Sequence, residues 1–116
     1  MKENIYTWEN GKRNGKGKEY YIGEIVFEGE YLNGKRNGKG KEYNDGKLIF
    51  EREYLNGQLN GKGKEYDKHG NLIFEGEYLY NQKRKGKEYV NNRLEYEGEY
   101  LYGRKWNGKG YDEKVI

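Results

Sequence analysis

The sequence predicts an all-β fold, an elongated single-layer antiparallel β-meander of about five hairpin repeats, on three observations. A glycine recurs every 23 or 24 residues, at Gly17, Gly40, Gly63, Gly86 and Gly110. Self-similarity at a fixed period of this length is typical of repeat architectures. Apolar and charged residues alternate between these glycines, which is the period of a β-strand. The chain also has 19 glycines and no proline, so its glycines are positional elements of the repeat.

The composition is that of one ordered domain. The 116 residues have room for a single array over 1–116, with repeats at approximately 4–26, 27–49, 50–73, 74–95 and 96–113. Only 32% of residues are hydrophobic and 37% are charged, but 16% are aromatic, and disordered chains are poor in aromatic residues. We therefore expect an ordered fold whose apolar surface comes mainly from the rings of its 14 tyrosines.

Charge and cysteine content exclude several classes of function. The 23 basic and 20 acidic residues are interleaved, and a net charge of +3 is too small to predict a polyanionic partner. The absence of cysteine excludes a disulfide framework and a thiolate metal site. No run approaches the roughly 18 apolar residues of a membrane span, and the first eight residues lack an apolar signal core. We therefore expect a soluble, cytoplasmic protein.

Each repeat is expected to form one hairpin of two strands. In the first strand of the fourth repeat, alternation places Leu72, Phe74, Gly76, Tyr78 and Tyr80 on one face, and Ile73, Glu75, Glu77 and Leu79 on the other. The second strand, over 61–66 in the preceding copy, divides into a glycine face and a lysine face. Asn-Gly pairs favour tight turns between the strands of a unit, and they occur at 10–11, 33–34 and 56–57.

The loops between repeats predict how the strands pair. Three-residue loops at 21–23, 44–46 and 90–92 and a four-residue loop at 67–70 each place a repeat glycine opposite a ring. Gly40, for example, would face Phe50, while Lys39 would face Glu51. A ring can cover the bare backbone of a strand glycine. Rings and glycines are therefore expected to share one face, with lysine and glutamate on the other.

The stretch Phe-Glu-Gly-Glu-Tyr-Leu-Asn-Gly-Lys-Arg-Asn-Gly-Lys-Gly at 27–40 resembles the MORN repeat. The shared pattern is aromatic-Glu-Gly, an aromatic residue two positions on, then Asn-Gly and Gly-x-Gly, and it recurs five times over roughly residues 5–112. Gly-Lys-Gly-Lys-Glu-Tyr, with its early turn, is similar to the variant repeat of a family of bacterial antitoxin-like proteins. The resemblance implies an elongated antiparallel β-meander with an aromatic-lined groove. It also implies roles in protein binding, dimerisation and sometimes membrane attachment, with no shared catalytic residues.

The chain departs from this pattern in the middle repeats. Arg52 replaces the strand glycine found at Gly29, Gly76 and Gly98, and Arg84 stands where Gly61 stands in the preceding copy. The fourth repeat reads Tyr80-Asn81 in place of its Asn-Gly turn. We expect the groove to be altered near these positions.

No residue set predicts an enzyme, a metal site or a cofactor site. The acidic pairs Glu51 with Glu53 and Glu75 with Glu77 lie among lysines, so an ionised ladder on a solvated face is favoured over general acid/base catalysis. His69 is the only histidine and cannot alone build a zinc site or a catalytic triad. Gly-Lys-Gly lacks the helix and the Gly-Lys-Ser/Thr end of a phosphate loop.

The aromatic stripe is the candidate binding site. Its rings must pack over the glycines, but a single-layer sheet leaves part of the stripe exposed, and a long exposed aromatic strip usually marks an interaction site. Arg52 is expected to stack on the neighbouring rings of Phe50 and Tyr54, and the alternative is that it binds an acidic group of a partner. The predicted partner-binding residues are Phe27, Tyr31, Phe50, Arg52, Tyr54, Phe74, Tyr78, Tyr80, Tyr96, Tyr100 and Tyr102.

The leading hypothesis is a non-enzymatic scaffold that binds a helical or extended peptide along the aromatic groove. The unpaired strands at the two ends also favour a homodimer or end-to-end self-association. One alternative is binding to anionic phospholipid through Lys39, Lys41, Lys62 and Lys64, although a glutamate faces most of these lysines. The other is stacking of single-stranded nucleic acid or glycan on the tyrosines, against which the chain lacks a basic groove.

Overall fold

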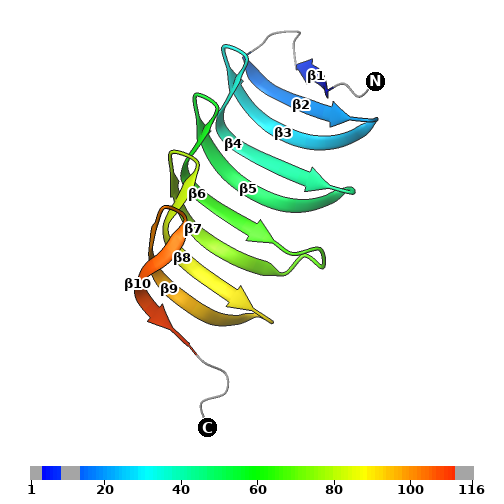
Figure 1. Cartoon of the computed structure of the whole chain (residues 1–116). Helices are drawn as coiled ribbons and strands as arrows, with labels where there is room; N and C mark the ends of the chain where they lie inside the picture. The colour runs from blue at the N-terminus through cyan, green and yellow to red at the C-terminus, as the bar shows by residue number, and fades with distance from the viewer. Residues whose placement is uncertain (1–3, 9–13, 112–116) are drawn as a thin grey trace.

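The computed structural model describes residues 4–8 and 14–111, with only the backbone described for 4–8. These residues form one antiparallel sheet whose ten strands follow one another in chain order (Figure 1). The first five strands are β1 (Asn4–Trp8), β2 (Gly15–Tyr21), β3 (Glu24–Leu32), β4 (Lys35–Asn44) and β5 (Lys47–Leu55). The remaining five are β6 (Gln58–Tyr66), β7 (Leu72–Leu79), β8 (Gln82–Val90), β9 (Arg93–Leu101) and β10 (Arg104–Gly110).

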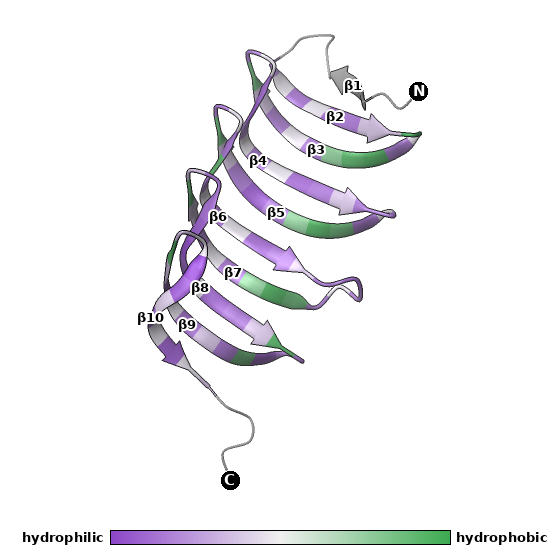
Figure 2. Ribbon diagram, in the orientation of Figure 1, coloured by the Kyte–Doolittle hydropathy of each residue, from purple (hydrophilic) through white to green (hydrophobic). Residues whose placement is uncertain are grey.

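The predicted single-layer β-meander is confirmed. The chain extends over 58 × 26 × 24 Å, and β1 and β10 lie at opposite ends of a curved stack of hairpins (Figure 1). No second layer of described residues covers the sheet, and no helix in the described part could cross a membrane. Hydrophobic residues are concentrated in β3, β5 and β7, whereas the even-numbered strands between them are mainly polar (Figure 2).

The turns within each unit agree with the prediction where they are described. Asn33-Gly34 and Asn56-Gly57 both have positive φ at each residue, the geometry of a type I′ hairpin turn. The third predicted Asn-Gly turn, at 10–11, lies outside the described residues. Between β6 and β7, the side chain of Asp67 accepts hydrogen bonds of 2.9 Å from the backbone N–H groups of His69 and Asn71, which closes the longer loop.

The predicted strand pairing is wrong by two residues. Between β4 and β5 the turn is the two-residue pair Asp45-Gly46, not a three-residue loop, and a β-bulge follows Glu42. As a result, Gly40 lies opposite Arg52 and not opposite Phe50. The same displacement recurs along the sheet, so most repeat glycines pair with other glycines, as Gly76 does with Gly63 and Gly86.

The predicted division into one face with rings and glycines and one face with lysine and glutamate is still correct. A shift of two residues leaves every side chain on the same face of the sheet. We name the faces the ring face and the charged face. On the ring face, each ring lies diagonally across the glycines, and a Cβ placed on Gly29 would come within 2.9 Å of the Cζ atom of Phe27. Lysine and glutamate alternate on the charged face, where Lys41 lies between Glu28 and Glu51. One column of glutamates, described below, is an exception.

The fifth repeat glycine is Gly108 and not Gly110. Gly108 pairs with Gly98, as Gly86 pairs with Gly76. Gly110 pairs with Tyr96, which is the place of a glutamate in the other repeats. The spacing of 24 residues from Gly86 therefore leads to Gly110, which is not the structural equivalent of the other repeat glycines.

The rings form the core of the protein. Phe27 and Phe74 are 0% exposed, and no other ring of the core exceeds 7%. Phe27 packs edge to face against Tyr31 and Tyr54, with ring centroids 5.7 and 5.6 Å apart. The remaining core residues are Leu59, Tyr78, Tyr96 and Tyr100. The expectation of a half-exposed aromatic strip is therefore wrong for these rings.

Candidate functional surfaces

The ring face is closed by a repeated set of a tyrosine, a glutamate and a cation. In the first set, the hydroxyl of Tyr31 donates a 2.6 Å hydrogen bond to Glu19, and Arg36 binds both carboxylate oxygens of Glu19 at 2.9 and 3.1 Å. The guanidinium of Arg36 also lies 3.8 Å from the ring centroid of Phe27. The set recurs as Tyr54, Glu42 and Arg52; Tyr78, Glu65 and Lys83; and Tyr100, Glu88 and Lys105.

These sets explain how a single layer buries its rings. The cations lie over the rings, where each is attracted to the ring's π face. The glutamates accept hydrogen bonds from the buried phenol hydroxyls, which satisfies both groups. The four glutamates therefore belong to the ring face, although their residue type suggested the solvated face. The sequence contained a signal for this assignment, because Glu19, Glu42, Glu65 and Glu88 follow the repeat glycine at the same interval as ring-face positions do.

In the second set, the cation comes from a different position of the repeat. Arg36, Lys83 and Lys105 lie opposite Tyr31, Tyr78 and Tyr100, but the equivalent residue opposite Tyr54 is the buried Leu59. Arg52, at a glycine position, supplies the missing charge to Glu42 at 2.9 Å. Its guanidinium stacks on Phe50 at 3.6 Å, as predicted, but the second ring in contact is Tyr78 and not Tyr54. Arg52 and Leu59 thus form a compensating pair.

The buried phenols make the fold sensitive to alkali. Burial, followed by the hydrogen bond to Glu42, raises the pKa of Tyr54 to about 12, and the same two causes raise the pKa values of Tyr31, Tyr78 and Tyr100. A pKa above the unfolded value near 10 stabilises the fold at lower pH, and this stabilisation is lost as the pH rises through the folded pKa.

We expect the free energy of unfolding to fall by more than about 2 kcal/mol between about pH 9 and pH 11.5. Urea denaturation at several pH values measures this loss, and phenolate absorbance follows the ionisation directly. Tyr78→Phe removes one raised pKa and should make the decline shallower. A free energy of unfolding that stays constant over this range would contradict the assignment of buried, glutamate-bonded phenols.

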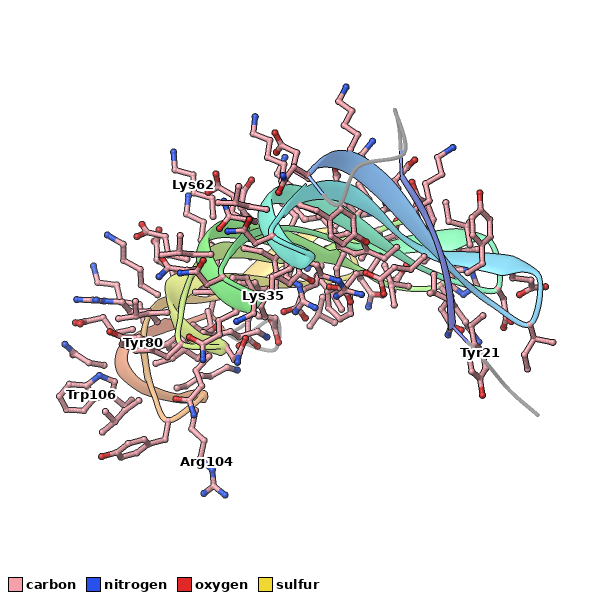
Figure 3. The ribbon with its side chains drawn as sticks, turned by 90° about the horizontal axis from the view of Figure 1, so that it is seen from above. Tyr21, Lys35, Lys62, Tyr80, Arg104 and Trp106 are labelled. Atoms are coloured by element: carbon pink, nitrogen blue, oxygen red, sulfur yellow. The ribbon has the colours of Figure 1, made fainter. Side chains whose placement is uncertain are left out.

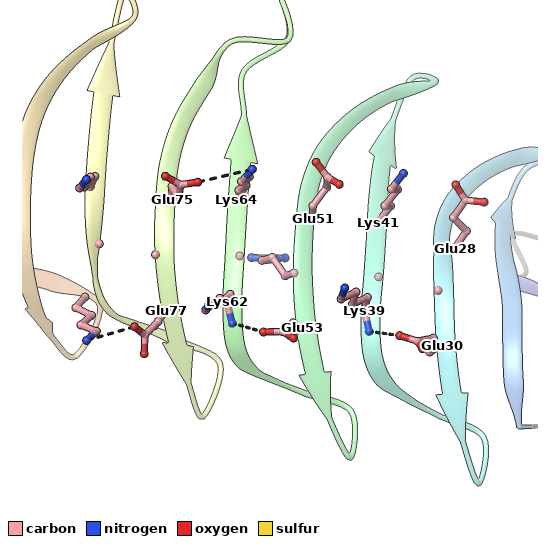
Figure 4. A pocket seen from close by; sticks show the side chains of 18 of the residues that line it. Glu28, Glu30, Lys39, Lys41, Glu51, Glu53, Lys62, Lys64, Glu75 and Glu77 are labelled. Carbon is pink, nitrogen blue, oxygen red and sulfur yellow. Dashed lines mark hydrogen bonds and ion pairs between the residues drawn. The ribbon is translucent and has the colours of Figure 1, made fainter.

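An open trough of about 1490 Å³ runs along the charged face from β2 to β9 (Figure 4). Eight lysines on the even-numbered strands and eight glutamates on the odd-numbered strands line it, and its floor is mostly glycine backbone. Ion pairs link neighbouring columns, with Lys85 3.3 Å from Glu77 and Lys64 3.7 Å from Glu75. Glu53 also accepts a 2.6 Å hydrogen bond from the backbone N–H of Lys62. The trough is thus a neutral lattice of alternating charge.

A row of leucines borders the trough. Each is the last residue of its strand and comes two residues after a trough glutamate, so strand alternation puts it on the charged face. Three of them are about half exposed, Leu32 at 46%, Leu55 at 50% and Leu101 at 47%. We name Leu32, Leu55, Leu79 and Leu101 the leucine row. It is an apolar border beside the charged lining of the trough.

The predicted binding residues therefore fall into two groups. Phe27, Tyr31, Tyr54, Phe74, Tyr78, Tyr96 and Tyr100 are buried in the core, and Phe50 and Arg52 are partly buried beside them. Only Tyr80 and Tyr102 are freely exposed, and both lie in turns of the sheet edge. The leucine row was not predicted, although these leucines recur in the sequence at intervals of 23, 24 and 22 residues.

The candidate catalytic residues remain dispersed. Glu51, Glu53, Glu75 and Glu77 belong to the trough lattice, and His69 lies in the exposed loop between β6 and β7. Within the described residues, no three histidine or carboxylate side chains converge in a way that could hold a metal ion.

The family model described as MORN repeat matches residues 7–23, 27–47 and 53–71. These matches correspond to the first three repeats of the array. A comparison with curated proteins finds no significant match.

Proposed function

The chain belongs to the MORN-repeat family, and on this premise we propose that it is a non-enzymatic protein-interaction module whose partner lies along the trough of the charged face. MORN repeats are generally protein- or membrane-binding motifs and not an enzyme family. The observation that carries the proposal is the leucine row beside an uncovered trough that extends across eight strands. Exposed apolar side chains that gather along one border of a surface are typical of interaction sites.

The spacing of the leucine row fits an amphipathic helix. Successive leucines are two strands apart, which corresponds to roughly 10 Å. Seven residues of an α-helix rise about 10.5 Å, so one apolar side chain per heptad would meet each leucine. Oppositely charged trough residues alternate at roughly 4.8 Å. Charged residues three or four positions apart on the helix would be spaced closely enough to pair with them.

The balance of charge favours a protein partner over a lipid surface. The trough lysines are matched in number by the trough glutamates, and the lysines of β4, β6 and β8 have glutamates on both neighbouring strands. Attraction to anionic lipid depends on a cluster of unneutralised basic residues. The trough lacks such a cluster, so binding to vesicles should be weak and should not depend on salt.

The test compares variants of the leucine row with variants of the opposite edge. A partner is first isolated from the native source with the immobilised chain and then titrated against purified variants. Leu32→Glu with Leu55→Glu places charges in the row, and we expect affinity to fall by tenfold or more, as for central interface residues. Ile22→Glu with Val90→Glu changes two apolar residues that are at least as exposed as Leu32 but lie elsewhere, and it should leave the affinity unchanged.

Unchanged affinity of the folded Leu32→Glu/Leu55→Glu variant would refute the proposed location. Binding to phosphatidylserine vesicles in place of a protein would refute the proposed partner class. Self-association through the exposed edge of β10 stays a prediction, which sedimentation velocity over a range of concentrations measures directly.

A further inference from the structure

The last two repeats differ from the earlier ones along a single edge of the sheet. This edge carries the turns within each unit. The first turn residue is asparagine at Asn33 and Asn56, but tyrosine at Tyr80 and Tyr102. A second position differs in the same way. In the earlier repeats it is a glycine with positive φ that pairs with a core tyrosine, at Gly15, Gly38 and Gly61. The equivalent residues of the last two repeats are Arg84 and Trp106, which lie at β-bulges. At these four positions, asparagine or glycine of the earlier repeats corresponds to Tyr, Arg or Trp, the residue types that are enriched among the strongest contributors to protein binding.

The two turn tyrosines adopt a backbone conformation that disfavours them. Their φ values are +50° for Tyr80 and +53° for Tyr102, where asparagine is well tolerated and a bulky side chain costs about 1 kcal/mol. Burial does not offset this cost, because the two side chains are 71% and 81% exposed. Strained residues that the fold does not require often mark functional positions. Ile22 has a similar φ at the opposite edge, where the other described non-glycine residues with positive φ are Asp45, Asn91 and Asn92, which tolerate this conformation.

The exposed side chains at this edge are aromatic and basic. Trp106 is 61% exposed, and Figure 3 shows Tyr80, Trp106 and Arg104 at the same side of the molecule, away from Tyr21. Lys83 and Lys105 of the same strands pair with glutamates of the ring face. In contrast, Arg84 and Arg104 are exposed, and no carboxylate among the described residues pairs with either of them. We name Tyr80, Arg84, Tyr102, Arg104 and Trp106 the turn-edge patch.

We propose that the turn-edge patch is a docking site for an acidic protein segment that carries an aromatic or aliphatic anchor residue. Exposed Tyr, Trp and Arg are the residue types that carry most of the binding energy in protein interfaces. The two exposed guanidinium groups would pair with carboxylates of the segment in a bidentate manner, while its anchor would pack among the three rings. Two basic residues fall short of the four to eight that recruit a protein to an acidic membrane surface. The patch lies outside the trough and adjoins one end of the leucine row, because Tyr80 and Tyr102 directly follow Leu79 and Leu101. Leu32 and Leu55, at the other end of the row, belong only to the site proposed above.

The test uses a displayed library of random 12-residue peptides and the full chain. We expect enrichment of peptides in which Asp or Glu flanks an aromatic or aliphatic residue, with affinities that weaken as salt increases. The principal variant, Tyr80→Asn with Tyr102→Asn, installs the residues of the earlier repeats. It should lower the affinity of the chain for the enriched peptides by about tenfold or more. The midpoint of urea unfolding should stay constant or rise. Trp106→Ala and Arg84→Ala provide a second, independent variant.

Ile22→Asn is the matched control, because it relieves the same backbone conformation outside the patch and should leave peptide affinity unchanged. Leu32→Glu with Leu55→Glu should also leave it unchanged, which separates this site from the trough. The proposal is overturned if the patch variants bind the enriched peptides as tightly as the parent chain. It is also overturned if the library yields no acidic peptides, or if phosphatidylserine vesicles or single-stranded oligonucleotides occupy the patch in their place.

Discussion

Gly76→Ala is expected to lower the free energy of unfolding by about 3 kcal/mol or more, the range of severe overpacking. A Cβ atom at this position would lie 2.7 Å from the Cα atom of Gly86 and 2.8 Å from the Cζ atom of Phe74. It would also meet the carbonyl oxygen of Lys85. Two of these obstacles are backbone atoms of the paired strand, so β7 and β8 would have to separate. Urea denaturation followed by circular dichroism measures the effect.

Gly110→Ala is the matched control. The sequence spacing made Gly110 equivalent to the other repeat glycines, but the nearest atom to a Cβ at this position is the carbonyl oxygen of Glu95, 3.8 Å away. We therefore expect a change within about 0.5 kcal/mol, as for an ordinary surface substitution. An equally large loss in both variants would contradict the assignment of Gly108 as the fifth repeat glycine.

The exchange of Arg52 and Leu59 should produce the strongest coupling between two side chains. Arg52→Gly alone leaves the carboxylate of Glu42 without its closest cation and is expected to destabilise the fold by about 2–4 kcal/mol. Leu59→Arg alone brings a second guanidinium into a packed site and should cost about 1–3 kcal/mol. The double variant rebuilds the arrangement of Arg36 and Glu19, with a glycine opposite Gly63 in place of the arginine, and should lie within about 1 kcal/mol of the parent chain.

A double-mutant cycle measures this coupling as the departure of the double variant from the sum of the two single variants. The Nε atom of Arg52 is buried without a hydrogen-bond partner, whereas the Nε atom of Arg36 bonds Glu19, so the rebuilt set has better hydrogen bonding. Arg36→Leu, which removes a cation with no substitute, should not be rescued by Leu59→Arg. If the changes in the free energy of unfolding caused by Arg52→Gly and Leu59→Arg simply add in the double variant, the proposed compensation between Arg52 and Leu59 is contradicted.

Much of the fold follows from local pattern. The alternation in segments such as 72–80 predicted the strands and the faces, and the Asn-Gly pairs at 33–34 and 56–57 predicted the turns. The pairing between strands did not follow, because loops of two and three residues contain the same residue types and differ only by a bulge such as the one after Glu42. The error preserved the faces because it was an even number of residues.

The candidate site was harder to predict, because burial in a single layer depends on side chains that reach from neighbouring repeats. Arg36 covers Phe27 of its own hairpin and binds Glu19 of the preceding one, and no local pattern reports such a contact. The aromatic stripe was therefore expected to be exposed, when its own cations and glutamates cover it. Comparison of equivalent turn residues, Asn33 with Tyr80, does identify the turn-edge patch from sequence once the pairing of the repeats is known.

The central claim is that the rings of the ring face form a closed core, which leaves the trough and the turn-edge patch as the surfaces available to partners. Hydroxyl-radical labelling of the folded chain, read by mass spectrometry, tests this claim most directly. We predict that Phe27 and Phe74 stay unmodified while Tyr80, Tyr102 and Trp106 are labelled rapidly. Rapid labelling of Phe27 and Phe74 in the folded protein would contradict it.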